Sequence, residues 1–427
     1  MLIIKKNGSI QEWKPEKIRG AILLANKRTK EEIDQKELER LSDIVKNNIN
    51  KETVTIDELH ELVMRVLRDE GYTQTFNQYA SYRNYKKIFS KSFIEGYNDS
   101  KKIMESGDTE NANKDSTLNS TKQVLIASGT MRTYMKKFVM RKEWIDAHDN
   151  GLIHIHDLAE RFLNSHNCCL FRMDNVLRGG FELNGIKYSE PGGVQKAFDV
   201  AGDVVLSASA QQYGGFTVSY VDEVFSYYAE KTYNKAYKYF LDKEIEDAKE
   251  FDYEISEKII KAKAKKRAEE TTIREIEQGY QAFETKLNTI NNSLAQTPFV
   301  TISFGLKTDK WAREISKVIL KTRTKGLGQN KTTAVFPKLI FLYRSEINGD
   351  KNSPNYDIKK LAIKCSSLRL YPDYLSGDKG DQKEYYEECG RMVSAMGCRA
   401  YLGKFYHPQT GELIFEGRAN IGKQCAA

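Results

Sequence analysis

The stretch PFVTISFGL, at residues 298–306, has the apolar and β-branched residues of a β-strand. Two further strand-like runs follow it, KLIFLYR at 338–344 and ELIFEG at 412–417, and segments with a helical pattern lie between the runs. Strands that alternate with helices are typical of mixed α/β proteins. These runs therefore predict an α/β fold for this region of the chain.

The chain has 427 residues, of which 40% are hydrophobic and 30% are charged. This length and composition are typical of a globular protein of roughly two to three domains. No apolar run reaches the roughly 18 residues that a membrane-spanning helix needs, and the N-terminal apolar stretch is too short for a signal peptide. We therefore expect a cytoplasmic protein that does not contact a membrane.

The formal net charge is +8, from 67 Lys and Arg residues against 59 Asp and Glu residues. This excess is spread along the chain without a dense basic arm, so it fits phosphate-bearing small ligands as well as nucleic acid. The six cysteines contain no CxxC pair. We therefore expect neither a disulfide framework nor a structural zinc site within these residues.

The first 95 residues have the pattern of a small compact unit. Residues 2–13 predict a β-hairpin, because two short runs flank Asn7-Gly8, a dipeptide that favours a type I′ turn. Pro15 stands in the first turn of a predicted helix, and Thr55 begins a sequence that resembles a capping box. Three more helical stretches are predicted, at residues 31–49, 56–71 and 73–93.

The chain then changes in composition. Residues 96–120 are rich in Asp, Asn, Ser, Gly and Lys, which predicts a linker or an exposed loop. Residues 193–235 predict helix. The highly charged stretch at 242–285 predicts a solvated helical hairpin that packs through its Ile, Tyr and Phe side chains. A dimerisation or regulatory helix pair is the alternative interpretation of this stretch.

Basic residues cluster around the first hairpin and the start of the helix that follows it. They are Lys5, Lys6, Lys14, Lys17 and Arg19. The backbone amides of the hairpin turn and the N-terminus of the helix can donate further hydrogen bonds to a phosphate group. From the residues alone, a triphosphate site and a solvated basic face both fit this cluster.

The stretch IIKKNGSIQEWKPEKIRGAI at 3–22, with YASYRNYKK at 79–87, resembles the ATP-cone. The ATP-cone is a regulatory nucleotide-binding domain of many ribonucleotide reductases, so the resemblance implies ATP and dATP as allosteric effectors. It implies that Lys17 reaches the phosphates. The hairpin positions that match the nucleotide contacts are Ile3, Lys5, Lys6, Asn7 and Gly8. The turn Lys6-Asn7-Gly8 replaces the usual Arg-Asp-Gly but keeps a basic residue and the turn geometry.

Histidines and cysteines occur close together in the second region. DNGLIHIHDL at 149–158 places His154 and His156 on one side of a predicted short strand, and Cys168 and Cys169 follow soon after. Adjacent cysteines of a strand point to opposite faces, so their spacing is poor for a shared metal ion. A metal site, a buried structural cluster and a catalytic thiol all stay open on this pattern.

An ordered series of motifs over residues 1–422 resembles the anaerobic (class III) ribonucleotide reductases. Besides the stretches already quoted, the series contains NANKDS (111–116), QQYGG (211–215), LKTRTKGLGQNKTTAVFPKLIF (320–341), MGCRAYL (396–402) and GRAN (417–420). The resemblance implies an ATP-cone at residues 1–95. It also implies that residues 96–427 form the N-terminal part of a ten-stranded α/β barrel of the glycyl-radical enzyme type.

The same resemblance implies a radical reaction that reduces ribonucleoside triphosphates to DNA precursors. Cys398 matches the cysteine whose thiyl radical takes the 3′-hydrogen of the ribose. Cys168 matches a second cysteine on the opposite side of the sugar, and Asn420 matches an asparagine beside the substrate hydroxyls. His154 and His156 would help to shape the pocket. The other cysteines are expected to be structural: Cys169, Cys365, Cys389 and Cys425.

The family also implies cofactors and partners. Formate would serve as the reductant, an S-adenosylmethionine-dependent iron–sulfur enzyme would activate the protein, and the chain would form a homodimer. The relatives carry a glycyl-radical motif close to RVxGY and a cysteine zinc site, and neither motif occurs in this sequence. We therefore expect the glycyl radical and the zinc ion only in a further C-terminal part. A split gene, an interrupted reading frame and a truncated product all fit this pattern, and in the first case a complementing chain would supply that part.

Two alternatives to a reductase follow from the same residues. The chain could be a catalytically inactive remnant that still binds ATP or dATP. A nucleic-acid-binding protein is disfavoured, because the lysines cluster at one turn. Residues 187–205, where the relatives bind a specificity effector, contain SEPGG and DVAGD and do not match the family's contacts. The sequence therefore leaves the effector and the preferred ribonucleotide open.

Overall fold

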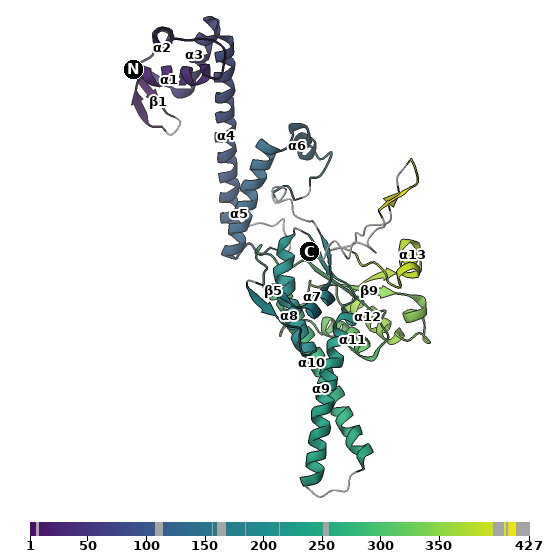
Figure 1. The fold of residues 1–427 in the computed structure, drawn as a ribbon. Coiled ribbons are helices and arrows are strands. Elements are labelled where there is room, and N and C mark those ends of the chain that lie inside the picture. The colour runs from purple at the N-terminus through teal and green to yellow at the C-terminus, as the bar shows by residue number, and fades with distance from the viewer. Residues whose placement is uncertain are drawn as a thin grey trace. The chain divides into compact units, whose positions relative to one another are not determined.

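The structure is a computed structural model. It describes residues 1–5, 8–106, 114–155, 157–159, 168–183, 185–212, 214–250, 256–395, 405–406 and 409–415. The chain forms two compact units (Figure 1). The N-terminal unit contains Met1–Lys101 and Gly129–His154, and the sheet-bearing unit contains Lys102–Ser128 and Ile155–Ala427.

The N-terminal unit contains a three-stranded sheet with the order β2-β1-β3. Strand β1 (Leu2–Ile4) pairs with the antiparallel strand β2 (Ile10–Glu12), which confirms the predicted hairpin. Gly8, in the turn between them, has a φ of +79°, a conformation that glycine adopts without steric cost. Strand β3 (Thr53–Thr55), which the sequence did not reveal, pairs in parallel with β1 and places Val54 opposite Ile3.

The strands are followed or interleaved by four helices, α1 (Pro15–Asn26), α2 (Gln35–Asn47), α3 (Ile56–Asp69) and α4 (Thr73–Ser106). The expected start signals are present: Pro15 occupies the first turn of α1, and Thr55 and Glu58 form the predicted capping box of α3. The apolar faces of these helices meet in one core, in which Ile22, Leu41 and Val63 are fully buried.

The predicted linker at 96–120 is wrong for its first part, because α4 continues to Ser106. Its polar residues are compatible with helix, since the Ser100 hydroxyl donates to the Gly96 carbonyl four residues earlier at 2.8 Å. Three further helices follow: α5 (Asn119–Tyr134), the π-helix η1 (Met135–Val139) and α6 (Lys142–Asp149). The expected boundary between residues 95 and 96 stays a prediction.

A five-stranded parallel sheet forms the centre of the sheet-bearing unit and confirms the predicted α/β class. Its strands are β4 (Cys169–Phe171), β7 (Phe216–Val218), β8 (Val300–Phe304), β9 (Lys338–Tyr343) and β10 (Asp373–Ser376), in the order β10-β9-β8-β7-β4. Parallel strands joined by helices agree with part of an α/β barrel.

The sheet has two different faces. On the outer face, alternate residues such as Phe216, Ile302 and Phe341 belong to a large apolar core. This core is completed by α8 (Val194–Ala208), α9 (Val221–Glu250), α10 (Glu257–Thr289), α11 (Lys310–Lys325) and α12 (Tyr356–Leu368). The inner face carries Thr217, Thr301 and Ser303, which are fully buried polar residues. This alternation follows from the two-residue period of a strand.

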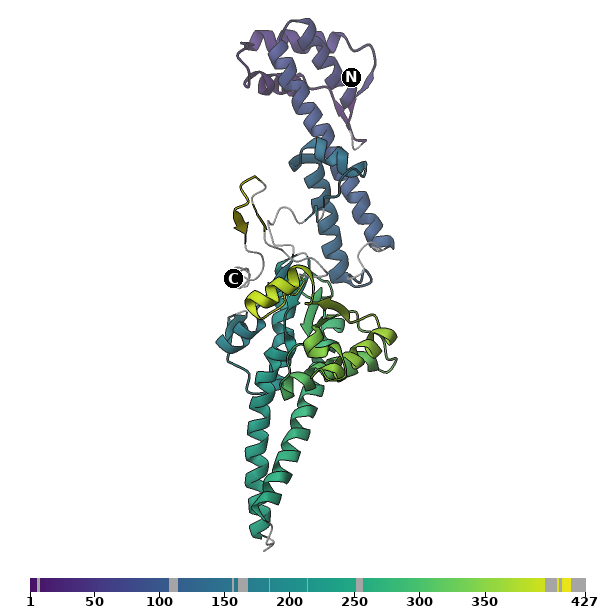
Figure 2. The same cartoon turned by 90° about the vertical axis from the view of Figure 1, so that its right-hand side faces the viewer.

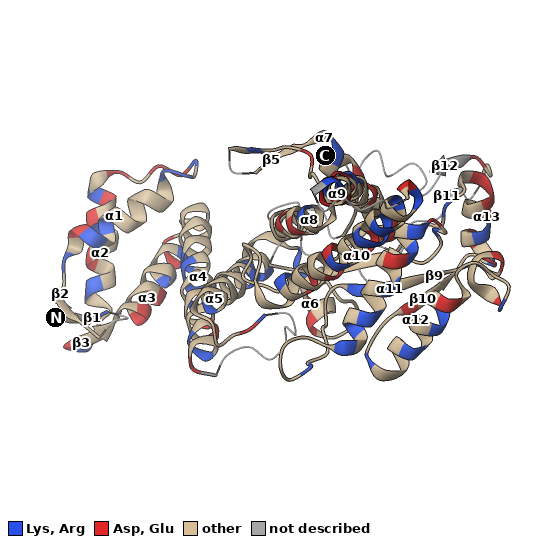
Figure 3. Ribbon diagram, turned by 90° about the horizontal axis from the view of Figure 1, so that it is seen from below, with Lys and Arg blue, Asp and Glu red and all other residues tan. Residues whose placement is uncertain are grey.

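The prediction of helix over residues 193–235 is wrong in its middle, where β7 separates α8 from α9. Phe216 and Val218 pack into the core while Thr217 faces the other side, so the segment has the period of a strand. The predicted charged hairpin is confirmed: α9 and α10 lie side by side (Figure 2). Both basic and acidic residues occur along α10 (Figure 3), whose packed side contains Ile260, Ala264 and Ala268.

The remaining elements are short. They are α7 (Met173–Gly179), the hairpin β5–β6 (Phe181–Leu183 and Ile186–Tyr188), η3 (Ser209–Gln211), η4 (Ser345–Gly349), α13 (Gly380–Cys389) and the hairpin β11–β12 (Phe405–Tyr406 and Leu413–Phe415). The strand-like run ELIFEG therefore pairs with β11 and not with the five described strands of the central sheet. Among the described helices, none is long and apolar enough to span a membrane.

Candidate functional site

The N-terminal unit contains a cavity of about 290 Å³ between the β1–β2 hairpin, α1, α3 and α4. Ile3, Lys5 and Lys17, three of the residues predicted to contact a nucleotide, line this cavity. Gly8 is not among the lining residues and shapes the turn instead. Lys6 and Asn7 lie outside the described residues. The hairpin and the first helix thus bring the predicted basic side chains to one hollow.

Helix α4 adds residues that the sequence reasoning missed. Arg83 and Lys86 line both this cavity and an adjoining one of about 450 Å³, as Lys17 also does. The Nε of Arg83 is buried and has no hydrogen-bond partner within the described chain, and its guanidinium lies 5.4 Å from the centre of the Tyr79 ring. The motif YASYRNYKK contains both basic residues at a spacing of three, which places them on one helix face. Which face of α4 borders the cavity depends on how this helix packs, and the sequence pattern alone does not give that packing.

The electrostatics of this hollow favour an anion. Lys5, Lys14, Lys17, Arg83 and Lys86 line it, whereas Glu12 is the acidic residue among its described lining. Clustered cations attract phosphate groups. The aromatic side chain of Trp13 and the ring of His60 also line the cavity, and they provide apolar surface for a nucleobase.

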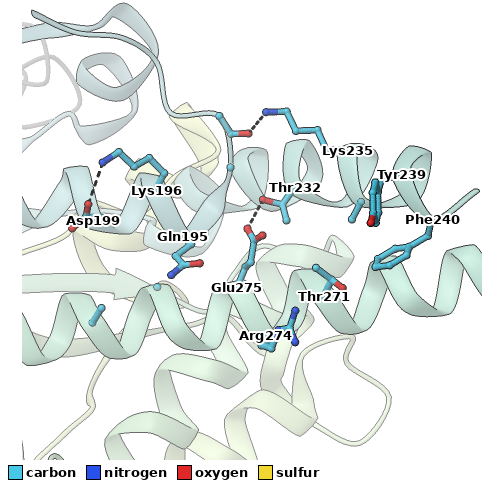
Figure 4. A pocket seen from close by; sticks show the side chains of 15 residues that line it. Gln195, Lys196, Asp199, Thr232, Lys235, Tyr239, Phe240, Thr271, Arg274 and Glu275 are labelled. Carbon is cyan, nitrogen blue, oxygen red and sulfur yellow. Dashed lines mark hydrogen bonds and ion pairs between the residues drawn. The ribbon is translucent and has the colours of Figure 1, made fainter. Parts of the chain in front are cut away.

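A second, larger groove of about 840 Å³ lies in the sheet-bearing unit, at the N-terminus of α8 and between α9 and α10. Figure 4 shows Lys196, Lys235 and Arg274 around it, together with the rings of Tyr239 and Phe240. The Nζ of Lys235 donates to the carbonyl oxygen of Gly192 at 2.8 Å. This groove includes part of the 187–205 region, where the sequence left an effector site open.

The N-terminus of α8 is already capped from the neighbouring helices. The amide of Val194 donates to the Thr232 hydroxyl at 2.9 Å, and that hydroxyl donates to the carboxylate of Glu275 at 3.1 Å. Lys286 pairs with Asp199 and Asp203 at 2.9 Å each, and the hydrogen bond from Lys286 lowers the pKa of Asp199 against the effect of burial. Both acidic and basic side chains therefore border the groove.

Cys168 lies directly before β4 in the sheet-bearing unit. The side chain of the next residue, Cys169, packs against the apolar core on the outer face. Because successive residues of an extended chain point to opposite faces, Cys168 is directed to the inner face. Its Sγ accepts a hydrogen bond from the backbone N–H of Gly215 at 3.2 Å, and the Gln212 side chain fixes the Gly215 carbonyl at 2.5 Å. Cys168 is thus held by the QQYGG motif.

The chain that leads to Cys398 crosses the same inner face. The Ala395 carbonyl accepts a hydrogen bond from the Thr217 hydroxyl at 2.9 Å, and Thr217 lies opposite Leu170, two residues after Cys168. Cys398 and Asn420 themselves lie outside the described residues, as does Cys425. Of the predicted catalytic residues, the structure therefore describes Cys168.

The histidines do not form the predicted strand. No strand is present in the described part of residues 149–159, and His154 lies instead with its ring 5.5 Å from that of His148. His156 lies outside the described residues. Across the described ranges, no group of three or more His, Cys, Asp or Glu side chains could hold a metal ion. Cys365 is buried in the core, and Cys389 is exposed at the end of α13.

The hairpin, the basic cavity and the helices around them define the class of the N-terminal unit: residues 1–88 match the family model of the ATP cone domain. Residues 110–424 match the model described as anaerobic ribonucleoside-triphosphate reductase. The chain belongs to the anaerobic ribonucleoside-triphosphate reductase family. The predicted resemblance, including the N-terminal ATP-cone, is thereby confirmed.

Relatives of the same description cover almost all of the chain. The anaerobic ribonucleoside-triphosphate reductase of Escherichia coli (strain K12) is 32% identical over 427 residues. The match covers 98% of this chain and 57% of the relative. The enzyme of Enterobacteria phage T4 is 37% identical over 314 residues, or 73% of this chain and 48% of the relative. The matched regions thus span about half the length of these relatives, 57% of the first and 48% of the second.

Solved structures of similar proteins include the anaerobic ribonucleotide reductase of Thermotoga maritima. Its complex with dATP and CTP has a TM-score of 0.43 and 15% identity, and its form with glycerol in the active site has a TM-score of 0.44 and 15% identity. Each comparison covers 70% of this chain and 50% of the solved chain.

Proposed function

We propose that this chain is the N-terminal portion of an anaerobic reductase that converts ribonucleoside triphosphates to deoxyribonucleoside triphosphates. The observation that carries the proposal is the inner face of the sheet. Cys168 is anchored there by Gly215, and Ala395, three residues before Cys398 in the sequence, is anchored to the neighbouring strand by Thr217. Three residues of extended chain span at most about 11 Å, which limits how far Cys398 can lie from the Ala395 anchor on this face.

In this proposal the two cysteines act on opposite sides of the ribose. The thiyl form of Cys398 takes the 3′-hydrogen and becomes a thiol, which weakens the bond from the 2′-carbon to its oxygen, and the 2′-hydroxyl leaves as water. Cys168 helps to deliver the reducing hydrogen, and Asn420 binds the substrate hydroxyls. Formate supplies the electrons and is oxidised to carbon dioxide. The hydrogen bond from Gly215 fixes the direction of the Cys168 thiol.

A glycyl radical would supply the unpaired electron for Cys398. No motif close to RVxGY occurs in this chain, which spans 57% of the Escherichia coli relative. The proposal therefore includes a complementing C-terminal part with the radical glycine and a zinc site. It also includes an S-adenosylmethionine-dependent activating enzyme and a homodimer, and it places the protein in the cytoplasm. The same proposal places the boundary between the ATP-cone, residues 1–95, and the part of the catalytic barrel, residues 96–427.

The N-terminal cavity would bind ATP or dATP as an allosteric effector. Ile3 and the hairpin contact the nucleoside, while Lys5, Lys17, Arg83 and Lys86 bind the phosphates. The proposal also assigns nucleotide contacts to Lys6 and Asn7, while Gly8 shapes the turn of the hairpin. The groove at the N-terminus of α8 is the second nucleotide site of the proposal, with Lys196 and Lys235 as the cations beside the phosphates. Its nucleotide is the specificity effector.

Nucleotide binding by the N-terminal cavity can be measured by calorimetry on the full chain with ATP and dATP. Lys17→Ala and Arg83→Ala should each weaken binding about 10- to 100-fold, because each removes a charge-assisted contact to phosphate. The matched control is Lys36→Ala, which removes an exposed lysine of α2 that does not line the cavity. Equal affinity in all three variants and the unaltered chain would place the nucleotide elsewhere.

Reductase activity separates this proposal from its alternative, an inactive remnant that binds nucleotide. The chain is combined with a C-terminal fragment of a relative, the activating enzyme, S-adenosylmethionine, a reductant for that enzyme, formate and a ribonucleoside triphosphate. Formation of deoxyribonucleotide that Cys398→Ser and Cys168→Ser abolish is the expected result. Tight ATP binding without product, although the relative's own N-terminal portion is active under the same conditions, would favour the remnant.

A further inference from the structure

The segment Met392–Ala395 runs across the inner face of the sheet, and side chains hold it at every residue. Its first residue is bound twice by one hydroxyl. The Met392 N–H donates to the Tyr220 hydroxyl oxygen at 2.6 Å, and that hydroxyl donates to the Met392 carbonyl at 3.0 Å. Both residues are buried, at 2% and 8% exposure. These two bonds satisfy a buried peptide that has no strand partner in the described chain.

The next residue is held in the same way by an amide. The Val393 N–H donates to the Oε1 of Gln382 at 2.9 Å, and the Nε2 of Gln382 donates to the Val393 carbonyl at 3.0 Å. Gln382 lies in α13 and is 4% exposed. One side chain thus replaces the two hydrogen bonds that a neighbouring strand would make.

The last two residues are bound by the sheet itself. The hydroxyls of Ser394 and Ser303 are 2.6 Å apart, and the Thr217 hydroxyl donates to the Ala395 carbonyl at 2.9 Å. Ser303 belongs to β8 and Thr217 to β7. A slip of the segment by one residue would break these bonds and would also turn each following side chain to the opposite face.

Tyr220 has a backbone conformation that its residue type rarely adopts. Its φ is +55°, in the left-handed region, which is sterically costly for a residue with a large side chain. Its N–H donates to the Ser303 hydroxyl at 3.1 Å, so the same residue contacts both the sheet and Met392. The guanidinium of Arg391 lies 5.0 Å from the centre of its ring and pairs with Glu223 at 2.5 Å. Such strain persists where surrounding contacts determine it, and it is concentrated at functional sites.

We propose that Tyr220 is a positioning residue, which sets the register of Met392–Ala395 on the inner face and thereby the placement of Cys398 opposite Cys168. The assignment of the cysteines rests on the proposed function, whereas the register role rests on the described contacts. The hydroxyl is the essential group, since it makes both bonds to Met392. Tyr220 touches neither substrate nor the reacting sulfur atoms in this proposal.

The register role is tested by hydrogen exchange of the full chain, followed by mass spectrometry of peptides that contain residues 392–395. Tyr220→Phe removes the hydroxyl and keeps the ring, and we expect the amide of Met392 to exchange about tenfold faster or more, as the loss of a buried hydrogen bond predicts. The matched control is Tyr228→Phe, in which the deleted hydroxyl is buried and has no partner within the described residues. Unchanged exchange in Tyr220→Phe would overturn the proposal.

The effect on the cysteines is measured with dibromobimane, which becomes fluorescent when it bridges two thiols. The unaltered chain and Tyr228→Phe should bridge Cys168 to Cys398 at the same rate, and Cys168→Ser and Cys169→Ser identify the partner thiol. Tyr220→Phe should bridge about tenfold more slowly. Thr217→Val, which deletes the hydrogen bond to the Ala395 carbonyl at the other end of the segment, should slow the bridging as well.

The outcomes separate the two proposals. Faster exchange of Met392 with slower bridging supports Tyr220 as a positioning residue. Faster exchange with unaltered bridging overturns the link between Tyr220 and Cys398. If neither the unaltered protein nor Tyr228→Phe forms a bridge between Cys168 and Cys398, the proposed active site is contradicted. Hydrogen exchange of Met392 then still decides whether Tyr220 holds the segment.

Discussion

The two units of this chain build their candidate sites in different ways. In the N-terminal unit, the cavity is lined by residues of a single short region, from Ile3 to Lys86, and most of its cations occur in two motifs. In the sheet-bearing unit, Cys168 is bound by Gly215, and the inner face of the sheet binds residues as distant in sequence as Ser394 and Ala395. A site of the first kind depends on local sequence, whereas a site of the second kind depends on the packing of the sheet.

The two units also treat charge differently. The cations of the N-terminal cavity lie beside solvent and are available to a ligand. The sheet-bearing unit buries charges and pairs them internally: Arg323 and Glu284 form an ion pair at 2.7 Å with both side chains fully buried. The first arrangement favours binding of an anion, and the second makes the unit sensitive to the loss of either partner. Substitutions in each unit can test this contrast.

The largest expected effect is the removal of the buried arginine. Arg323→Met leaves Glu284 buried without its partner, and it also removes the hydrogen bond to the Pro337 carbonyl at 2.6 Å. We expect the sheet-bearing unit to lose about 3–5 kcal/mol of stability. Hydrogen exchange of peptides from β8 reports the opening free energy of that unit, and peptides from α1 report the N-terminal unit.

A double substitution provides the control for this prediction. Arg323→Met with Glu284→Leu removes both charges and should recover most of the lost stability, because no buried charge is then left unpaired. The exchange of α1 peptides should stay the same in both variants. If Arg323→Met accelerates exchange equally in α1 and β8, the two units do not unfold independently, and the contrast between them fails.

The second effect is a dependence of stability on pH. Burial raises the pKa of Asp222 to about 7 from its ordinary value of 3.8, against the hydrogen bonds from the Gly305 and Glu223 amides, which lower it. The folded chain therefore holds an extra proton between about pH 4 and pH 7. The contribution of Asp222 to the free energy of unfolding should be greatest below pH 4. It should fall by about 1.4 kcal/mol per pH unit as the pH rises toward 7.

Asp222→Asn should remove this slope, because the amide does not ionise. The slope of stability with pH is measured by unfolding the chain in urea at pH 5, 6 and 7, with hydrogen exchange of β8 peptides as the probe of the sheet-bearing unit. Asp43→Asn, at an exposed position of α2 in the N-terminal unit, is the matched control and should leave the slope unaltered. A slope that persists in Asp222→Asn would show that another group titrates.

The elements that the sequence predicted correctly are those whose signals are local. The hairpin around Gly8, the capping box at Thr55 and the strand at 300–304 each depend on neighbouring residues. The strand at 216–218 was missed because it has only three residues and lies between two longer helices. The continuation of α4 beyond residue 95 was missed because its polar composition resembles that of a loop, although the Ser100 hydroxyl is satisfied within the helix.

The candidate sites follow the same rule. Ile3, Lys5 and Lys17 could be predicted because the hairpin and the first helix are adjacent in sequence. Arg83 belongs to a motif that was recognised, but its contribution depends on how α4 packs on α1. Tyr220 had no signal at all in the sequence, because its role comes from a left-handed backbone and from contacts to residues more than 80 positions away.

The smallest expected effects concern the helix caps, which should be alike in the two units. Thr55 caps α3 by accepting from the Glu58 amide at 3.2 Å, and Asp309 caps α11 by accepting from the Ala312 amide at 3.0 Å. Thr55→Ala and Asp309→Ala should each cost about 1 kcal/mol, because each leaves one amide of the first turn without its partner. Exchange of peptides from α3 and α11 measures the two losses separately. If Asp309→Ala costs several times more stability than Thr55→Ala, the Asp309 cap also supports the packing of the sheet. Helix caps would then be local features in the N-terminal unit and not in the sheet-bearing unit.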